Sequence, residues 1–215
     1  MRDPLYIIGA GGHAKSVAEI AFAANINLKA FISQDPLTVE LLGLPVLREL
    51  PQLQSASPFK IAIAIGNNYQ RQMAFDQLKE LFTIDFFPAL IHPSASVAVH
   101  SSIGFGTTLH QNATVGSDSH VGNFCTLNTG SNTDHDCHLS DFSSLGPGAN
   151  LGGSVTLGSR AVVAIGSTVR HGITIATDSI LGAASYAHTS TQANTISIGS
   201  PAHKIRDRRP GDKYL

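Results

Sequence analysis

Residues 103–127 read IGFGTTLHQNATVGSDSHVGNFCTL, and the spacing in this stretch decides the fold of most of the chain. An aliphatic side chain returns at every sixth position, and the period continues in both directions without an insertion. Fifteen of the sixteen positions are aliphatic, so the period reflects the fold and not a chance repeat. The series is Ile91, Val97, Ile103, Leu109, Val115, Val121, Leu127, Thr133, Leu139, Leu145, Leu151, Leu157, Val163, Val169, Ile175 and Leu181.

Two further regularities accompany the period. A small residue stands four places after nearly every aliphatic one, and glycine often follows the aliphatic residue directly. A period of six fits neither an α-helix nor a simple alternating strand, and it is typical of the hexapeptide β-helix. Each hexad then forms one short strand and one corner. The aliphatic side chain points into a narrow core, the small residue fits where bulk has no room, and glycine relieves the corner backbone. One coil cannot bury its apolar face alone, so the coils are expected to stack.

The first part of the chain follows a different pattern, in which short apolar runs alternate with amphipathic segments. This order of strands and helices predicts a small parallel α/β sheet. The pattern changes near Pro88, so we predict an N-terminal domain at residues 1–88 and a β-helix domain with a C-terminal tail at residues 89–215. The predicted strands are residues 5–8, 30–32, 60–65 and 86–87, and the predicted helices are residues 14–24 and 69–82.

Composition excludes several classes of protein. Charged residues make up only 13% of the 215 residues, which argues against a disordered chain. The formal net charge of −1 provides no basic field for binding nucleic acid. No apolar run approaches the roughly 20 residues that span a bilayer, and the first residues lack a signal-peptide pattern, so membrane insertion is not expected and a cytoplasmic location is predicted. Cys125 and Cys137 provide no disulfide framework.

The hexad that breaks the aliphatic rule contains Thr133. A broken local rule often marks a functional site, and His135 lies two places beyond the break. A neutral imidazole near pH 7 can take a proton from an amine or hydroxyl, and an adjacent carboxylate can orient the ring. Asp134 and Asp136 flank His135 equally closely, so spacing leaves the choice between them open. The spacing of His135 and His138 would suit a metal pair on a helix, which this segment is not, so no metal site is predicted.

Two short segments outside the hexads add a resemblance to a known family. Residues 8–15 read IGAGGHAK and residues 199–204 read GSPAHK. Together with the hexads, they resemble the bacterial sugar O/N-acetyltransferases of the NeuD/PglD type over nearly the whole chain. The resemblance implies a Rossmann-like domain that binds a sugar nucleotide, followed by a left-handed parallel β-helix. It also implies a homotrimer with acetyl-CoA in the groove between neighbouring β-helices.

The resemblance assigns roles in catalysis. The family has an acidic residue directly after its catalytic histidine, which favours Asp136 as the partner of His135. Acetyl transfer passes through an oxyanion that needs a preorganised N–H donor, and the resemblance assigns this donor to the backbone amide of Gly153.

Other positions match those that face acetyl-CoA in the family, namely Ser144, Ile165 and Ala183. Ser144 replaces the histidine that is common there, and Ala183 replaces a frequent glycine, so the contacts at these two positions are expected to differ. Lys204 is a candidate for meeting the phosphates of CoA.

The glycine loop that follows the first predicted strand fits a loose dinucleotide fingerprint, but no acidic residue stands convincingly at the end of the second strand. The resemblance instead implies that this loop holds a sugar nucleotide, at the edge of the sheet where ligands usually bind. Ser33 and Gln34 stand where the family often has an Asp pair, so sugar or base specificity is expected to differ. Asn128 matches a position near the acceptor amine. The residues assigned to this site are Gly11, Gly12, His13, Ser33, Gln34, Gly66 and Asn128.

The resemblance, together with these residues, implies an acetyl-CoA-dependent N-acetyltransferase that acts on the amine of a nucleotide-activated amino sugar in glycan biosynthesis. Two alternatives stay open: an O-acetyltransferase of a sialic-acid-like sugar, and a non-catalytic β-helix trimer.

Overall fold

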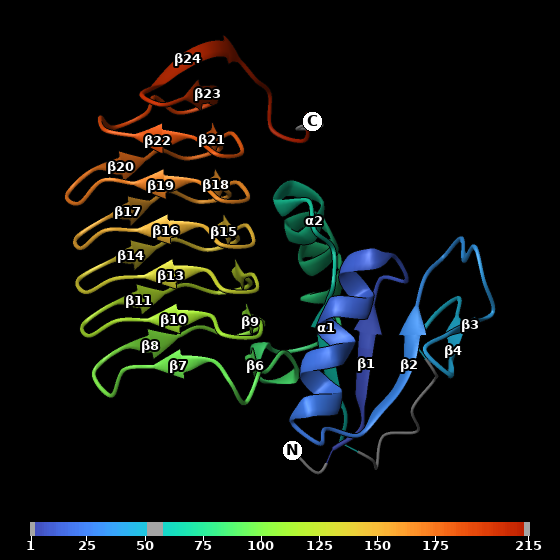
Figure 1. The fold of residues 1–215 in the computed structure, drawn as a ribbon. Helices are drawn as coiled ribbons and strands as arrows, with labels where there is room; N and C mark the ends of the chain where they lie inside the picture. Colours follow the sequence, from blue (N-terminus) through green and yellow to red (C-terminus); the bar gives the residue numbers. More distant parts are fainter. Residues whose placement is uncertain (1–2, 51–57, 213–215) are drawn as a thin grey trace.

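The computed structural model of the chain describes residues 3–50 and 58–212. A β-helix of stacked coils forms one part, and an α/β unit packs beside it (Figure 1). This arrangement confirms the predicted fold class, an α/β region followed by a left-handed parallel β-helix.

Each hexad forms one two-residue strand, and each strand pairs in parallel with the strand 18 residues along the chain, as His120 does with His138. The strands form three faces. The junction face, which faces the α/β unit, contains β6 (Leu90–Ile91), β9 (Thr108–Leu109), β12 (Thr126–Leu127), β15 (Ser144–Leu145), β18 (Val162–Val163), β21 (Ile180–Leu181), β23 (Thr195–Gly199) and β24 (Ala202–Asp207). The front face in Figure 1 contains β7 (Ser96–Val97), β10 (Thr114–Val115), β13 (Asn132–Thr133), β16 (Asn150–Leu151), β19 (Thr168–Val169) and β22 (Tyr186–Ala187). The rear face contains β8 (Ser102–Ile103), β11 (His120–Val121), β14 (His138–Leu139), β17 (Thr156–Leu157) and β20 (Thr174–Ile175).

The second residue of most of these strands is buried and builds the core of the β-helix, as the period predicts. Thr133 occupies the same position, and its side chain is only 1% exposed. Its hydroxyl has no hydrogen-bond partner within the described ranges. The break in the aliphatic rule is therefore a polar core position directly before the loop that contains His135.

The glycines that follow the aliphatic residues do not have the predicted role. They all lie outside the positive-φ region, and the left-handed corner position falls two residues later, as at Asp118 and Asp136 with φ of 56°. A Cβ atom at Gly158 would lie 2.3 Å from the backbone nitrogen of Thr177 in the next coil. These glycines are required because neighbouring coils approach closely, and not because the corner backbone is strained.

The α/β unit contains one mixed sheet with the strand order β3-β4-β2-β1-β5, in which only the β3–β4 pair is antiparallel. The β3–β4 hairpin was not predicted. The strand predicted at residues 86–87 is wrong, because Phe86 ends a 3-10 helix and Phe87 is buried against the ring of Phe75. The elements are β1 (Leu5–Ile8), α1 (Gly12–Ala23), β2 (Leu28–Ile32), β3 (Glu40–Leu41), β4 (Leu44–Leu47), β5 (Lys60–Ile63), α2 (Asn68–Leu78) and η1 (Ile84–Phe86).

Arg71 of α2 fixes the α/β unit to the junction face. Its side chain is 1% exposed. The guanidinium donates to the carbonyl oxygens of Phe124 and Phe142 in the β-helix, at 2.8 and 3.0 Å, and to that of Ile65 in the α/β unit, at 2.8 Å. The ring of Phe75 lies 4.2 Å from that of Phe124, centroid to centroid. Charge-assisted hydrogen bonds and aromatic packing therefore hold the turn after β5 against the β-helix.

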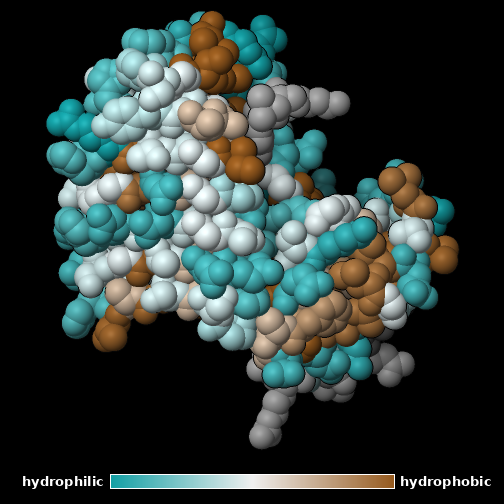
Figure 2. Space-filling view, viewed as in Figure 1, coloured by the Kyte–Doolittle hydropathy of each residue, from teal (hydrophilic) through white to brown (hydrophobic). Residues whose placement is uncertain are grey.

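The surface differs between the two parts of the molecule. Figure 2 shows hydrophobic side chains gathered on the α/β unit around α1, whereas the front face of the β-helix carries mainly hydrophilic and weakly polar residues. None of the described helices is long and apolar enough to cross a membrane.

We predict that Gly158→Ala lowers the free energy of unfolding by about 1–3 kcal/mol, because the added methyl group overlaps the next coil. The control is Gly148→Asn, since Gly148 has φ of 64° and open space around its Cβ position, and asparagine tolerates the left-handed conformation. Chemical denaturation measures both variants. Equal losses would contradict the assignment of Gly158 to close coil packing.

Candidate functional site

His135 lies in the loop between β13 and β14, at the corner where the front face meets the rear face. In Figure 1 this loop lies on the side of the β-helix opposite the α/β unit. The side chain of His135 is 60% exposed. The first of the predicted catalytic groups is therefore accessible to a molecule that binds on the outside of the β-helix.

The two flanking carboxylates have different contacts with His135. The Oδ2 atom of Asp136 lies 2.7 Å from the ring nitrogen Nδ1, whereas Oδ1 of Asp134 accepts the backbone N–H of His135 at 2.8 Å. The hydrogen bond with Asp136, together with the charge of Asp134, raises the pKa of His135 above its ordinary value. A carboxylate on Nδ1 favours the tautomer that leaves Nε2 able to accept a proton.

Gly153 lies beside this ring, one coil further along the chain. A Cβ atom at Gly153 would lie 2.6 Å from both Cε1 and Nε2 of His135, so only glycine leaves room for the imidazole there. Within residues 3–50 and 58–212, the N–H of Gly153 has no hydrogen-bond acceptor. One coil earlier, His135 occupies the position that corresponds to Gly153, and its N–H donates to the side chain of Asp134. Gly152, which corresponds to Asp134, has no side chain that could accept from the N–H of Gly153. The structure thus brings a proton acceptor and an unpaired N–H donor together.

A groove of about 820 Å³ on the front of the β-helix is lined by both His135 and Gly153. Arg170, His171 and Tyr186 also line it, and the sequence analysis did not single them out. Arg170 and His171 stand 18 residues, or one coil, after Gly152 and Gly153. Counting forward by one coil from Gly153 would therefore have identified them from the sequence.

The glycine loop of the α/β unit leads into α1. Gly11 is the N-cap residue of this helix and provides no side-chain cap, and Gly12 begins the helix. His13 is in the first turn, and a Cβ atom on Gly66 would lie 3.9 Å from the Cβ and Cγ atoms of His13. The turns after β1 and β5 therefore meet at the carboxyl edge of the parallel sheet, as predicted for a ligand site.

Ser33 and Gln34 line a separate part of the same edge. A cleft of about 1190 Å³ extends from the end of β2 to α2, and its lining includes Ser33, Gln34, Gly9 and Gln70. The cleft could hold a base or ribose next to the loop that contains Gly11, Gly12 and His13. Asn128 does not line this cleft; it lies directly after β12 in the β-helix, and its backbone N–H donates to the carbonyl oxygen of Leu145 at 3.0 Å.

The four positions predicted to contact acetyl-CoA do not form one cluster in the chain. Ser144 is buried at the junction, where its hydroxyl donates to Oδ1 of Asn68 at 2.6 Å. Ile165 is 56% exposed, and Ala183, one coil further along, is also exposed. Lys204 lies in β24 with its Nζ atom 2.6 Å from a carboxylate oxygen of Asp207.

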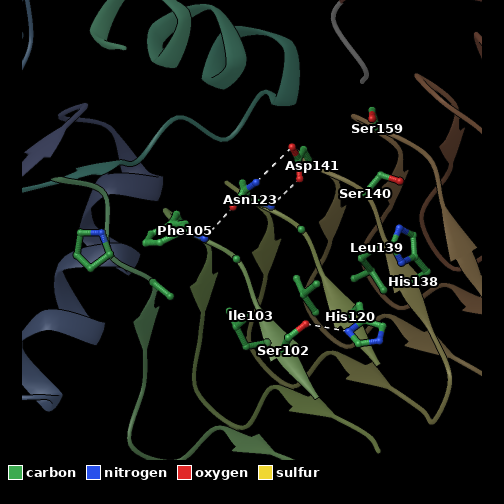
Figure 3. Close-up of a pocket in the computed structure, with 15 residues that line it drawn as sticks. Ser102, Ile103, Phe105, His120, Asn123, His138, Leu139, Ser140, Asp141 and Ser159 are labelled. Carbon is green, nitrogen blue, oxygen red and sulfur yellow. Dashed lines mark hydrogen bonds between the residues drawn. The ribbon is translucent and has the colours of Figure 1, made fainter. Parts of the chain in front are cut away.

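Figure 3 shows the residues that line a second groove, of about 810 Å³, on the rear face of the β-helix. The Oγ atom of Ser102 lies 2.9 Å from Nδ1 of His120, and the rings of His120 and His138 lie 6.5 Å apart. Neither His135 nor Gly153 lines this groove. Within the described part of the chain, no group of three or more His, Cys, Asp or Glu side chains could hold a metal ion.

Comparison with a family model identifies the N-terminal part of the chain: residues 4–78 match the PglD N-terminal domain. The comparison with curated proteins gave no match.

Solved structures match nearly the whole chain. A histidine-to-asparagine variant of perosamine N-acetyltransferase from Caulobacter crescentus, in complex with CoA and GDP-perosamine, is 33% identical, with a TM-score of 0.88 over 95% of this chain and 97% of that one. The acetyltransferase domain of PglB from Neisseria gonorrhoeae, in complex with acetyl coenzyme A, is 31% identical, with a TM-score of 0.88 over 95% of this chain and 100% of that one. WeeI from Acinetobacter baumannii shares the fold at 22% identity, with a TM-score of 0.71 over 94% of this chain and 99% of that one.

We predict that Asp136→Asn lowers the pKa of His135, because its hydrogen bond is the largest cause of the raised value. Titration of the ring by NMR measures the change. Asp118→Asn is the matched control, since Asp118 has the same left-handed corner conformation one coil earlier. An unchanged pKa in Asp136→Asn would show that the Nδ1 contact is absent in solution.

Proposed function

The chain belongs to the NeuD/PglD-type family of sugar acetyltransferases, and we propose that it transfers an acetyl group from acetyl-CoA to the amine of a nucleotide-linked amino sugar. The observation that carries this proposal is the contact of His135 with both Asp136 and Gly153. Perosamine N-acetyltransferase, which is 33% identical, binds CoA and GDP-perosamine. This supports an acceptor amine on a sugar that is linked to a nucleoside diphosphate.

His135 is the proposed general base. Its Nε2 takes a proton from the amine as the amine nitrogen attacks the carbonyl carbon of the thioester, and the CoA thiolate then leaves. Asp136 holds Nδ1 and stabilises the imidazolium that forms. The unpaired N–H of Gly153 donates to the oxyanion that develops on the acetyl oxygen.

The proposed acetyl-CoA contacts are with Ile165, Ala183 and Lys204 on the outside of the β-helix. Ser144 occupies a different environment from theirs, because its hydroxyl bonds to Asn68 and Arg71 at the junction. The hydroxyl of Ser144 is therefore already engaged in hydrogen bonds within the junction, and we propose no direct bond from it to acetyl-CoA.

We propose that two copies of the chain form each site, in a homotrimer. His135 lies at the corner between the front and rear faces, whereas His13 and Asn128 lie by the corner between the junction and front faces. These corners are the two opposite edges of the front face of one β-helix. A neighbouring copy would place its sugar-nucleotide loop, with Gly11, Gly12, His13 and Gly66, beside His135 of the first.

Thiol release from acetyl-CoA tests the proposed reaction against a panel of acceptors. The panel contains UDP- and GDP-linked 4-amino sugars beside free sialic-acid-type sugars. We expect turnover only with a nucleotide-linked amino sugar. Turnover only with the free acid sugar would replace this proposal with O-acetylation, and no turnover with any acceptor would favour the non-catalytic trimer.

We predict that His135→Asn lowers kcat about 10²–10⁴-fold and leaves the KM for acetyl-CoA nearly unchanged, because only proton transfer is lost. His138→Asn is the matched control, since His138 is also exposed but lines the second groove. Steady-state kinetics measures both. Full activity of His135→Asn would overturn the proposed base.

The pH dependence follows from the same base. His135 accepts a proton only when neutral, so kcat/KM is expected to rise with pH through the pKa of His135, with a midpoint above the ordinary value. In Asp136→Asn the lower pKa moves the midpoint to lower pH. A midpoint that does not move would assign the rising limb to another group, such as the substrate amine.

A further inference from the structure

His110 is a buried side chain that the proposed reaction does not yet use. It follows β9 at the corner between the junction and front faces, and it is 0% exposed. Neither Nδ1 nor Nε2 has a hydrogen-bond partner within the described residues. Because buried polar side chains are nearly always hydrogen-bonded, the two unpartnered nitrogens of His110 require an explanation.

The ring of His110 packs against the ring of His13 from the α/β unit. Their centroids lie 5.7 Å apart, with 38° between the ring planes. Nε2 of His13 is also buried and has no partner in the described part of the chain. The two rings are therefore neighbours across the junction, and each has an unpartnered ring nitrogen.

The surroundings of the two rings keep both neutral at pH 7. Burial lowers the pKa of each to about 4; the charge of Arg71 adds to the effect at His13, and His13 and His92 add to it at His110. A neutral imidazole donates from one nitrogen and accepts at the other. An anion beside His13 would oppose these effects and favour the protonated ring.

The position of His110 links the two parts of the proposed substrate site. The backbone N–H of His110 donates to the carbonyl oxygen of Leu127, the residue directly before Asn128, so Asn128 stands at the same corner one coil further along. His13 lies next to Gly66 in the sugar-nucleotide loop. His110 thus lies at the meeting point of the loop and the acceptor residue.

We propose that His110 is a positioning residue for the diphosphate of the nucleotide sugar. It accepts a hydrogen bond from Nε2–H of His13 and so directs Nδ1 of His13 toward the phosphate oxygens. When the diphosphate binds, His13 takes up one proton from solvent, donating from Nδ1 to phosphate and from Nε2 to His110. This inference rests on the proposed function, because the loop that contains His13 is assigned to the substrate through the family.

The test variant is His110→Phe, which keeps a ring of similar size and removes both nitrogens. We expect the KM for the nucleotide-linked amino sugar to rise about tenfold or more. The KM for acetyl-CoA should stay the same, and a cooperative melting transition should show that the variant is folded. His110→Gln, which restores an acceptor, should recover part of the affinity. A Gln variant as weak as the Phe variant would overturn the proposal.

Proton uptake provides a readout that a purely structural residue would not change. Calorimetric titration with the nucleotide sugar, in buffers of different ionisation enthalpy, should show proton uptake on binding to the wild type and less to His110→Phe. His100→Asn, at an exposed loop position, is the matched control. Equal uptake by wild type and His110→Phe would overturn the proposal.

The outcomes also separate this inference from the proposed function. If the wild type acetylates the nucleotide sugar and His110→Phe has the same KM, only the role of His110 fails. If the wild type acetylates no nucleotide-linked sugar, the proposed function fails. Calorimetry with UDP and GDP then decides the role of His110, and absence of binding by the wild type would overturn it too.

Discussion

The 18-residue register of the coils places nearly every functional group of the β-helix. Backbone hydrogen bonds connect successive coils at the site itself: the N–H of Asp136 donates to the carbonyl oxygen of Ser117, and that of Ser154 to the carbonyl oxygen of His135, both at 2.9 Å. A shift of one residue would turn the aliphatic side chains out of the core, so the hydrophobic effect holds the register. The same register sets the ring of His135 over Gly153. The proposed base and the proposed N–H donor are thus held by the core and not by a flexible loop.

The second constraint is the junction between the two parts of the chain. Arg71 donates to carbonyl oxygens on both sides, which fixes the turn around Gly66 against the β-helix. Ser144 belongs to this network through Asn68. The hydroxyl of Ser144 also accepts a hydrogen bond from the Arg71 guanidinium at 3.1 Å. The side chain at the position that the resemblance assigns to the cofactor therefore bonds within the junction.

Much of the fold could be predicted because the β-helix repeats a local rule. The position of Thr133 in the core, and of His135 two places later, followed from counting by six. The sequence also led us to expect that glycines relieve the corners, whereas the structure shows that Gly158 allows close contact between coils. That distinction depends on the distance between two coils, which the pattern along one chain does not contain. The burial of Phe87 and Arg71 could not be predicted for the same reason, since both pack across the junction.

The site uses one residue type in two opposite electrostatic environments. His135 is exposed and hydrogen-bonded to Asp136, which raises its pKa and suits it to take a proton during a reaction. His13 and His110 are buried, and the charge of Arg71 acts on His13, which keeps both rings neutral until an anion arrives. In the proposed binding step, the pair is neutral before the diphosphate binds and gains one proton when it binds. The junction therefore carries no second permanent positive charge beside Arg71. The division follows from where the chain places each ring, on an outer corner or between two packed parts, and this explains why counting histidines in the sequence could not separate the two roles.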